Sequence, residues 1–210
     1  MHCPQPNIEI VHLNETHRES VESLCEECFP IHYPDWWYNN ILSDRVQFSI
    51  GAFSDVHLVG MIVAEYQSPR EAREQGKISY SCSNYSVLYI ISLGVRSEYR
   101  RQGIARKLIC LLLDSLNTNC KLVYLHVQST NDVAINFYQW QNFQEYSKVP
   151  GYYTINDTPA DALVYTYPIH GGPTELVPWT DLFLNSIYMM YDWTYTQFQK
   201  LFSYVKENFT

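Results

Sequence analysis

Residues 86–105 read SVLYIISLGVRSEYRRQGIA and predict a strand, a polar turn and the start of a helix. The first ten residues are nearly continuous in apolar side chains, which is typical of a strand buried on both faces of a sheet. Apolar residues then recur at helical spacing, from Ile104 through Leu108 and Leu112 to Leu116. The sequence therefore predicts a buried strand that leads, through a glycine-containing turn, into an amphipathic helix.

The turn RRQGIA at residues 100–105 has the properties of an anion-binding site. The first backbone N–H groups of a helix have no partner within the helix, and together with the helix dipole they attract a phosphate. Gly103 and the small Ala105 keep side-chain bulk away from an approaching pyrophosphate, and Arg100 and Arg101 add positive charge. The segment is neither a Walker loop, which needs Gly-Lys followed by Ser or Thr, nor a full Rossmann fingerprint.

Strands and helices alternate on both sides of this unit in the pattern of a mixed α/β sheet. Apolar runs predict strands at residues 8–13, 48–53, 57–65, 121–127 and 162–168. Apolar residues at helical spacing predict helices at residues 15–28, 36–42 and 131–140. The polar segment 67–76 is predicted as an exposed hairpin or loop.

The composition restricts the class of protein and of partner. With 14 basic and 22 acidic residues, the 210-residue chain carries a net charge of −8. This charge argues against a nucleic-acid binder, because that class needs a basic face. It suits cationic substrates such as amines, and it equally suits plain solubility. The first ten residues lack the pattern of a secretory signal peptide.

The six cysteines are scattered along the chain, and the simplest interpretation is free thiols in a reducing cytosol. Cys25 and Cys28 have the spacing of a zinc or redox pair. A structural zinc site needs two further ligands, and no second pair follows in the sequence. We therefore expect no metal in this protein.

Two motifs together resemble those of the GNAT acetyltransferases. One is Arg/Gln-x-x-Gly-x-Gly/Ala, which is present here after a strand that ends in Leu93-Gly94-Val95; the other runs from Asn131 through Phe137-Tyr138 to Asn142-Phe143. Many members of the family have glycine in place of Asn142, but asparagine tolerates a left-handed backbone. The resemblance implies acetyl-CoA as cosubstrate and an α/β fold of the α+β type. In this GNAT fold a central mixed, twisted sheet splays between its two middle strands and has helices on both faces.

Further segments resemble the NatF-type N-alpha-acetyltransferases, which are relatives of the NatE catalytic subunit. The segments are FPIHYP at 29–34, YIISLGV at 89–95, YLHV at 124–127 and Tyr152-Tyr153, and the resemblance covers about residues 8–170. It implies that a free α-amine attacks the thioester directly, with Tyr89 and His126 as catalytic residues on the two central strands. Without the resemblance, a histidine on a buried strand is more typical of a core residue than of a base.

The resemblance also implies two groups of binding residues. The cofactor-binding residues would be Leu93, Gly94, Val95, Arg100, Arg101, Gln102, Gly103, Ile104, Ala105, Arg106, Asn131 and Tyr138. An apolar slot for the substrate would be formed by Phe29, Pro30, Ile31, Tyr33, Ile91, Tyr152 and Tyr153. Such a slot suits the side chain of a first-position methionine, and tyrosine hydroxyls can fix the peptide backbone and its amine.

The predicted function is transfer of acetyl from acetyl-CoA to the α-amine of peptides that start with methionine or another apolar residue. His126 would act as general base through a water molecule, and Tyr89 would assist. Three alternatives stay open: a lysine (histone) acetyltransferase, a small-amine acetyltransferase and a non-catalytic coenzyme-binding membrane module. Tyr152 and Tyr153 argue against a lysine substrate, because two closed loops would block a peptide that continues on both sides.

Gly171-Gly172-Pro173 marks a shift in composition, which predicts a boundary between a domain at residues 8–170 and a C-terminal tail at 171–210. Two apolar stripes predict amphipathic helices in the tail: Trp179, Leu182, Phe183, Ile187 and Met190, and then Phe198, Leu201, Phe202 and Val205. Neither stripe is long enough to cross a bilayer. We expect peripheral contact with the cytosolic face of an internal membrane, the Golgi by resemblance. Packing back onto the domain, or pairing in a homodimer, is the alternative.

Overall fold

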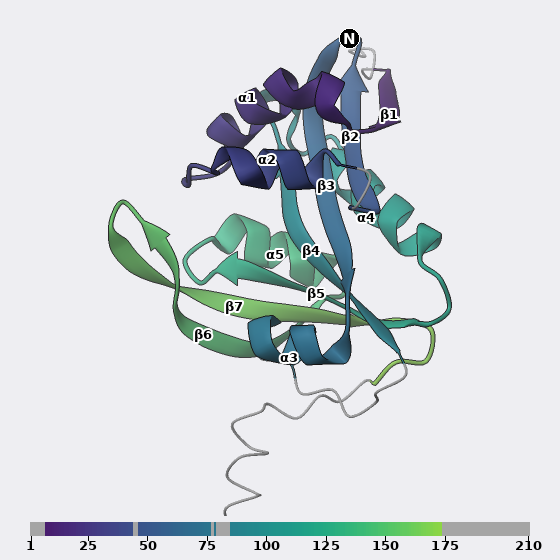
Figure 1. Ribbon diagram of the computed structural model, residues 1–210, viewed down its shortest axis with the longest axis vertical. Coiled ribbons are helices and arrows are strands. Elements are labelled where there is room, and N and C mark those ends of the chain that lie inside the picture. The colour runs from purple at the N-terminus through teal and green to yellow at the C-terminus, as the bar shows by residue number, and fades with distance from the viewer. Residues whose placement is uncertain (1–6, 44–45, 77, 79–84, 174–210) are drawn as a thin grey trace, which may run out of the picture.

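The computed structural model describes residues 7–43, 46–76, 78 and 85–173, which form a seven-stranded sheet with helices on both faces (Figure 1). The strands are β1 (Ile8–His12), β2 (Phe48–Ser54), β3 (His57–Gln67), β4 (Ser86–Val95), β5 (Cys120–Gln128), β6 (Gln144–Ile155) and β7 (Thr158–Pro168). The α-helices are α1 (Arg18–Cys28), α2 (Asp35–Ile41), α3 (Pro69–Gly76), α4 (Ile104–Ser115) and α5 (Asp132–Trp140). Two short 3-10 helices, η1 (Glu15–His17) and η2 (Ser97–Tyr99), precede α1 and the turn before α4.

The strand order is β1-β2-β3-β4-β5-β7-β6, and every neighbouring pair is antiparallel except β4 and β5. The parallel pairing of β4 with β5 ends at Ile90 and Leu125, although both strands continue. Beyond this point, within the described sheet, β4 pairs only with β3 and β5 pairs only with β7. The sheet therefore splits between its two middle strands, which confirms the splayed sheet that the resemblance implied.

Helices cover both faces of the sheet (Figure 1), and a separate cluster of buried side chains lies on each face. On one face α4 and α5 pack against the strands, and Ile104, Leu108 and Leu112 of α4 are buried as their helical spacing predicts. On the other face α1 and α2 cover the sheet, with Leu24 and Ile41 fully buried. A third cluster lies beneath α3, at the end of β4 where the parallel pairing is intact. Helices on both faces agree with the predicted fold class.

The prediction of a loop or hairpin at residues 67–76 is wrong, because this segment contains α3. The helix begins with Pro69, a residue that is preorganised for the first helical position. Ser68 and Glu71 form a reciprocal cap: the Ser68 N–H donates to Glu71 Oε2 at 2.7 Å, and the Glu71 N–H donates to Ser68 Oγ at 3.3 Å. Only Ala72 is buried among the residues of α3 whose side chains are described, so the segment carries almost no apolar periodicity.

The sequence analysis also placed Tyr152 and Tyr153 on a loop, whereas the structure places them on β6. This strand pairs with β7 in an interrupted register, with irregularities between Glu145 and Ser147 and between Val149 and Tyr153. Each irregularity shifts the alternation of inward and outward side chains, so a period of two does not persist along the strand. The interrupted pattern explains why no strand is evident there in the sequence.

The predicted tail helices and their membrane contact lie outside the described residues, which end at 173. Within the described part of the chain, no helix is both long and apolar enough to span a bilayer. In the same part, Cys25, Cys28, Cys110 and Cys120 are free thiols. No group of three or more His, Cys, Asp or Glu side chains in the described residues is arranged to hold a metal ion.

Candidate active site

The point where the sheet splits brings Tyr89 and His126 together. Tyr89 lies on β4 immediately before the last parallel pair, and His126 lies on β5 immediately after it. Their rings meet edge to face with centroids 5.6 Å apart. Since the two residues come from different strands, the register of the β4–β5 pairing fixes their separation. The pair that the resemblance singled out therefore shares one site at the opening of the split.

His126 is held neutral by its surroundings. Both ring nitrogens are buried, and neither makes a hydrogen bond with any residue that the structure describes. Burial lowers the pKa of the imidazole from 6.5 to about 4, because the charged form loses hydration. The ring of Tyr152 stacks flat on the imidazole, with centroids 4.0 Å apart and an interplanar angle of 7°. At neutral pH the side chain is therefore an uncharged proton acceptor whose hydrogen-bonding capacity is unused within the described chain.

Tyr89 is held in its protonated form. Its hydroxyl oxygen lies 3.3 Å from that of Tyr152. Burial, and then the proximity of the Tyr152 hydroxyl, raise the pKa of Tyr89 well above its ordinary value. The hydroxyl therefore keeps its proton over the working pH range and can donate a hydrogen bond. A protonated donor beside an uncharged acceptor is the arrangement that general acid–base chemistry needs.

Tyr124 is a further residue of this cluster that the sequence analysis missed. Its ring stacks on Tyr89 with centroids 4.7 Å apart and meets the edge of His126 at 5.9 Å. Its hydroxyl donates to Gln67 Oε1 at 2.5 Å, and Gln67 Nε2 donates in turn to Glu65 Oε1 at 3.0 Å. Tyr124 and His126 are two residues apart on one strand, so their side chains share a face. That spacing is the signal that could have identified it.

The two segments predicted to line the substrate slot face each other. Tyr33, on the loop between α1 and α2, meets the ring of Phe29 edge to face at 5.9 Å. Its hydroxyl lies 3.4 Å from Ser92 Oγ on β4. On the other side, burial raises the pKa of Tyr153, and the neighbouring hydroxyls of Tyr152 and Tyr33 raise it further. The aromatic groups of both segments thus approach each other beside Tyr89 and His126.

The remaining slot residues differ in accessibility. Pro30 is exposed, whereas Ile31 and Ile91 are half-buried. The sequence analysis missed Trp37, which lies behind the slot and stacks on Tyr33 with centroids 3.8 Å apart. This stack fixes the plane of the Tyr33 ring, because Trp37 is itself buried. Trp37 lies in the first turn of α2, so this helix supports the aromatic side of the predicted slot that Tyr33 forms.

The predicted anion site has the expected geometry at the start of α4. Gly103 occupies the N-cap with a left-handed φ of +83°, and no side chain of the described residues caps the helix there. Arg101 is also left-handed, with φ of +61°. A side chain at Gly103 would meet no described atom within 4 Å. Within the chain, glycine is therefore needed at this position for its backbone conformation, and its role in leaving room for a pyrophosphate stays a prediction.

The side chains around this turn divide into two groups. Arg101, Gln102 and Arg106 are exposed, Ala105 is half-buried and Ile104 is buried in the core. Arg100 is exposed as well, but it turns back toward β4, where its Nε donates to the carbonyl oxygen of Val95 at 2.9 Å. The first-turn N–H groups, with Arg101 and Arg106, therefore form a positive, accessible surface.

Gly94 has a packing role that the sequence did not indicate. A side chain at this position would approach Phe29 Cζ to 3.0 Å and Cys28 Cβ to 3.2 Å. The glycine thus lets the end of α1 and the slot loop lie directly on β4. Its neighbours Leu93 and Val95 pack toward the opposite face, against the core beneath α4. Segment 93–95 therefore packs against the slot loop on one face of the sheet and against the core beneath α4 on the other.

Asn131 and Tyr138 lie on the helix that follows β5. The side chain of Asn131 caps α5 by accepting a hydrogen bond from the Ala134 N–H at 3.1 Å. Tyr138 is buried in the core, edge to face with Phe143 at 5.6 Å, rather than projecting from the helix surface. Asn142 has a left-handed φ of +62°, in agreement with the tolerance expected of asparagine there.

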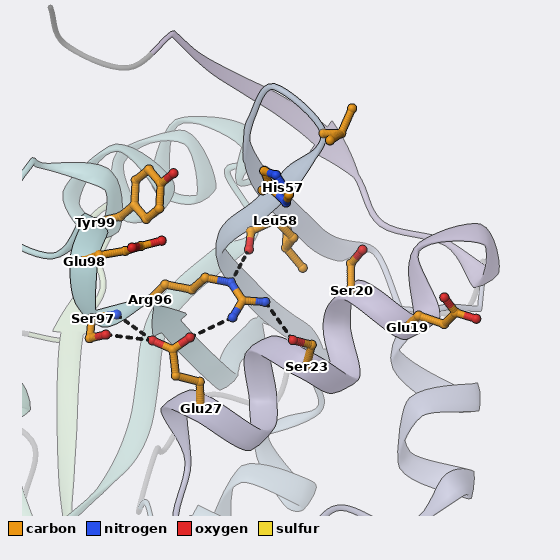
Figure 2. A pocket seen from close by; sticks show the side chains of 11 residues that line it. Glu19, Ser20, Ser23, Glu27, His57, Leu58, Arg96, Ser97, Glu98 and Tyr99 are labelled. Atoms are coloured by element: carbon orange, nitrogen blue, oxygen red, sulfur yellow. Dashed lines mark hydrogen bonds and ion pairs between the residues drawn. The ribbon is translucent and has the colours of Figure 1, made fainter.

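A separate cavity of about 630 Å³ lies between α1, the β2–β3 turn and η2 (Figure 2). Arg96 projects into it, pairing with Glu27 at 2.7 Å and donating to Ser23 Oγ at 3.0 Å and to the Leu58 carbonyl at 2.8 Å. The Ser97 N–H donates to Glu27 at 2.8 Å and, with Arg96, lowers the pKa of the Glu27 carboxyl. No residue predicted for the site is among those that line this cavity. The contacts of Arg96 and Ser97 with Glu27 and Ser23 instead hold α1 against the end of β4.

Comparison with known proteins identifies the family of the chain. The Acetyltransferase (GNAT) family matches residues 13–143 of the chain. N-alpha-acetyltransferase 60 from Danio rerio is 40% identical over 169 residues, which cover 77% of this chain and 69% of that protein. Two crystal structures of NAA60 from Arabidopsis thaliana, one with acetyl-CoA and one with a bisubstrate analogue, are 28% identical to it. They align with a TM-score of 0.70 over 79% of this chain and 100% of theirs.

The family match includes the split between β4 and β5, the turn before α4 and most of the slot. The similarity in sequence and the similarity in fold point to the same group of enzymes. The chain belongs to the GNAT acetyltransferase family and, within it, to the N-alpha-acetyltransferases related to N-alpha-acetyltransferase 60.

Proposed function

We propose that this protein transfers an acetyl group from acetyl-CoA to the α-amine of peptides that start with methionine or another apolar residue. The observation that carries the proposal is the placement of Tyr89 and His126 at the split of the sheet. We place the apolar slot for the first side chain beside them, between the aromatic residues of the α1–α2 loop and those of β6. The acetyl-CoA-bound and bisubstrate-bound relatives support the same cosubstrate and the same kind of acceptor.

The residues present fit acetyl-CoA. The uncapped first turn of α4, with Arg101 and Arg106 exposed, suits the pyrophosphate. The separated edges of β4 and β5 leave main-chain groups that can pair with the amides of the pantetheine arm. Ile91 has no register partner on either neighbouring strand of the described sheet, because β3 pairs with Ser92 and Ile90 around it. This bulge lies at the split, where a main-chain N–H of β4 would polarise a thioester carbonyl.

The chain's own groups would carry the proton movements. The free amine would bond to the thioester carbonyl carbon of acetyl-CoA, the C–S bond would break, and the coenzyme would leave as a thiolate that takes up a proton. An α-amine has a pKa near 8 against about 10.4 for lysine, so its neutral form at pH 7 costs roughly 3 kcal/mol less. The amine nitrogen becomes strongly acidic as its bond to carbon forms, so a weak base is sufficient. His126 would accept this proton through a water molecule, and the Tyr89 hydroxyl would donate a hydrogen bond beside it.

The slot favours a chain end over a lysine within a chain. Tyr33 and Tyr153 come from opposite segments and lie close enough for the Tyr33 hydroxyl to raise the pKa of Tyr153, so we expect a narrow entrance next to Tyr89 and His126. A free N-terminus enters such a space with a single strand of peptide behind it. A lysine within a chain would bring peptide on both sides. The rings of Phe29 and Tyr33 offer an apolar surface for the first side chain.

A mass-spectrometric acetylation assay tests this function directly. Peptides with Met-Leu and Met-Lys starts would be compared with acidic and serine starts, and with an N-blocked peptide that contains lysine. We expect acetyl on the α-amine of the methionine-starting peptides alone. Acetyl on the blocked lysine peptide alone would identify a lysine acetyltransferase instead. Binding of acetyl-CoA without transfer to any peptide would favour a small-amine enzyme or a non-catalytic module.

The pH dependence of kcat/KM should be set by the substrate amine and not by His126. Between about pH 5 and 7.5, kcat/KM should fall tenfold for each unit decrease in pH, because only the neutral amine reacts and its pKa is about 8. Burial holds the pKa of His126 at about 4, so its protonation adds a second decline only near that pH. Initial rates with a Met-Leu peptide would check this, and a second break near pH 6.5 would contradict it.

We further propose that the chain contacts the cytosolic face of an internal membrane, the Golgi, through its tail at 171–210. The support is the resemblance to the NatF-type enzymes and the two apolar stripes of the tail sequence. Substituting Phe183→Asp and Ile187→Asp in the full chain should move it from the membrane to the soluble fraction. An unchanged distribution would contradict the proposal. A mass of two chains for the wild type in detergent-free solution, lost in the variant, would assign the tail to a homodimer instead.

A further inference from the structure

The irregular part of the β6–β7 hairpin is built around Asp161. Val149 pairs with Ala162 and Tyr153 pairs with Ala160, so three residues of β6, 150–152, lie opposite the single residue Asp161 of β7. Gly151 in this bulge has a left-handed φ of +61°. A bulge re-aims the side chains of its strand, and here the re-aimed residue is Tyr152.

The side chain of Asp161 binds the bulge at two points. Its Oδ1 accepts a hydrogen bond from the Gly151 N–H at 2.9 Å, and its Oδ2 pairs with Lys148 Nζ at 2.8 Å. The hydrogen bonds from Lys148 and Gly151 hold the pKa of the carboxyl below its ordinary value. The carbonyl oxygen of Asp161 accepts from the Ser129 N–H at 2.9 Å, just after β5. Asp161 thus connects the bulge to the strand that carries the catalytic histidine.

Tyr152 follows Gly151 directly and contacts both members of the catalytic pair. Its ring stacks on His126 at 4.0 Å, and its hydroxyl lies 3.3 Å from that of Tyr89. Yet 38% of Tyr152 remains exposed, so packing alone does not fix it. β6 is the last strand of the sheet and has a neighbour on one side only. The bulge also contains a proline, which donates no hydrogen bond, and a glycine, which is conformationally free. Its shape therefore depends on the contacts of Asp161.

We propose that Asp161 is a positioning residue of the active site: it holds the bulge in the shape that lays Tyr152 over His126 and against Tyr89. This inference rests on the proposed function, because the site that Asp161 helps to shape is the proposed peptide site. Asp161 acts through Tyr152 and does not itself touch the catalytic pair. The carboxylate supplies the acceptor for Gly151 and the charge for Lys148, and the two contacts differ in importance. An ion pair at the surface contributes little, whereas the acceptor fixes the backbone.

Three variants separate the two contacts. Asp161→Ala removes both and should raise the KM for a Met-Leu peptide about tenfold and lower kcat several-fold, with acetyl-CoA affinity unchanged. Asp161→Asn keeps an acceptor for Gly151 and should stay within about twofold of the wild type. Lys148→Met removes the ion pair alone and should also stay within about twofold. Equal losses in Asp161→Asn and Asp161→Ala would overturn the assignment of the acceptor role.

A double-mutant cycle tests whether Asp161 acts through Tyr152. In a Tyr152→Ala background, Asp161→Ala should cause no further change in KM or kcat, because the residue it positions is gone. Fully additive losses would overturn the proposal. Folding of each variant is checked by its urea midpoint, and Asp161→Leu, which also removes the acceptor, replaces Asp161→Ala in the cycle if the alanine variant proves unstable.

The imidazole resonances of His126 give a readout that needs no substrate. In Asp161→Ala, Tyr152 should leave the ring, so these resonances should shift and the pKa of His126 should rise from about 4 toward 6.5. Lys148→Met should leave them unchanged. If the wild type acetylates no peptide but the resonances shift as expected, the proposed function fails and the positioning role stands. If peptides are acetylated but the resonances do not move, the positioning role fails and the function stands.

Discussion

Replacing His126 with alanine is expected to lower kcat for a methionine-starting peptide by at least 100-fold while acetyl-CoA binding stays unchanged. The expectation follows from the range of 10²–10⁴ over which a positioned base accelerates a reaction. His126 is the uncharged acceptor next to Tyr89 at the split, and it makes no hydrogen bond within the described chain that its removal would break. Its loss should therefore affect the chemistry more than the fold. Steady-state kinetics and calorimetric titration with acetyl-CoA measure the two quantities.

The matched control is His57→Ala. His57 is exposed and lines the separate cavity rather than the catalytic split, so its removal should leave kcat within about twofold of the wild type. A His126→Ala enzyme with wild-type kcat would show that another group accepts the proton. Loss of acetyl-CoA binding in the same variant would show instead that the imidazole supports the cosubstrate site.

The second large effect is expected at Gly103, where valine should weaken acetyl-CoA binding tenfold or more. The residue caps α4 with a φ of +83°, and a left-handed backbone costs an L-residue about 1–2 kcal/mol. A β-branched side chain fits this conformation especially poorly. The loop would relax to relieve the strain, and the first N–H groups of the helix would no longer converge on a phosphate. About 1.4 kcal/mol corresponds to each factor of ten in affinity.

Gly103→Asn is the control for this prediction, because asparagine tolerates the left-handed region. A side chain there meets no described atom within 4 Å, so asparagine adds no clash in the chain itself. We expect it to keep acetyl-CoA affinity within about threefold of the wild type. Equal losses for valine and asparagine would mean that bulk near the ligand, and not the backbone, sets the requirement for glycine.

The sequence predicts the fold best where a pattern is local and continuous. The strand at 86–95 is apolar along nearly its whole length, and the buried face of α4 repeats at helical spacing, so the sequence predicts both. α3 was not found, because its stability comes from a cap between Ser68 and Glu71 and not from a buried stripe. β6 was not found, because its bulges interrupt the alternation.

The residues of the candidate site also divide into those that a local sequence pattern predicts and those that only the three-dimensional structure reveals. Tyr89, His126 and the start of α4 were found because the resemblance rests on short segments that keep their residue types. The left-handed turn at Gly103, the register gap at Ile91 and the packing of Gly94 against Phe29 are properties of three-dimensional geometry. Tyr124 shares a face with His126 by its spacing, but its stacking on Tyr89 is a contact between strands that only the pairing of β4 with β5 reveals.

The split in the sheet also has a consequence for the lifetime of the protein in the cell. Beyond Ile90 and Leu125 the middle of the described sheet contains two unsatisfied edges, and exposed edges are where strands open or recruit other chains. A cosubstrate that pairs with these edges binds only the folded state, and at 100 times its Kd it stabilises that state by about 2.7 kcal/mol. Folded and unfolded populations are then linked to the supply of acetyl-CoA. When that supply falls, more of the protein would be unfolded and degraded by proteases. A shortage of acetyl-CoA would then lower the amount of enzyme as well as its rate of acetylation.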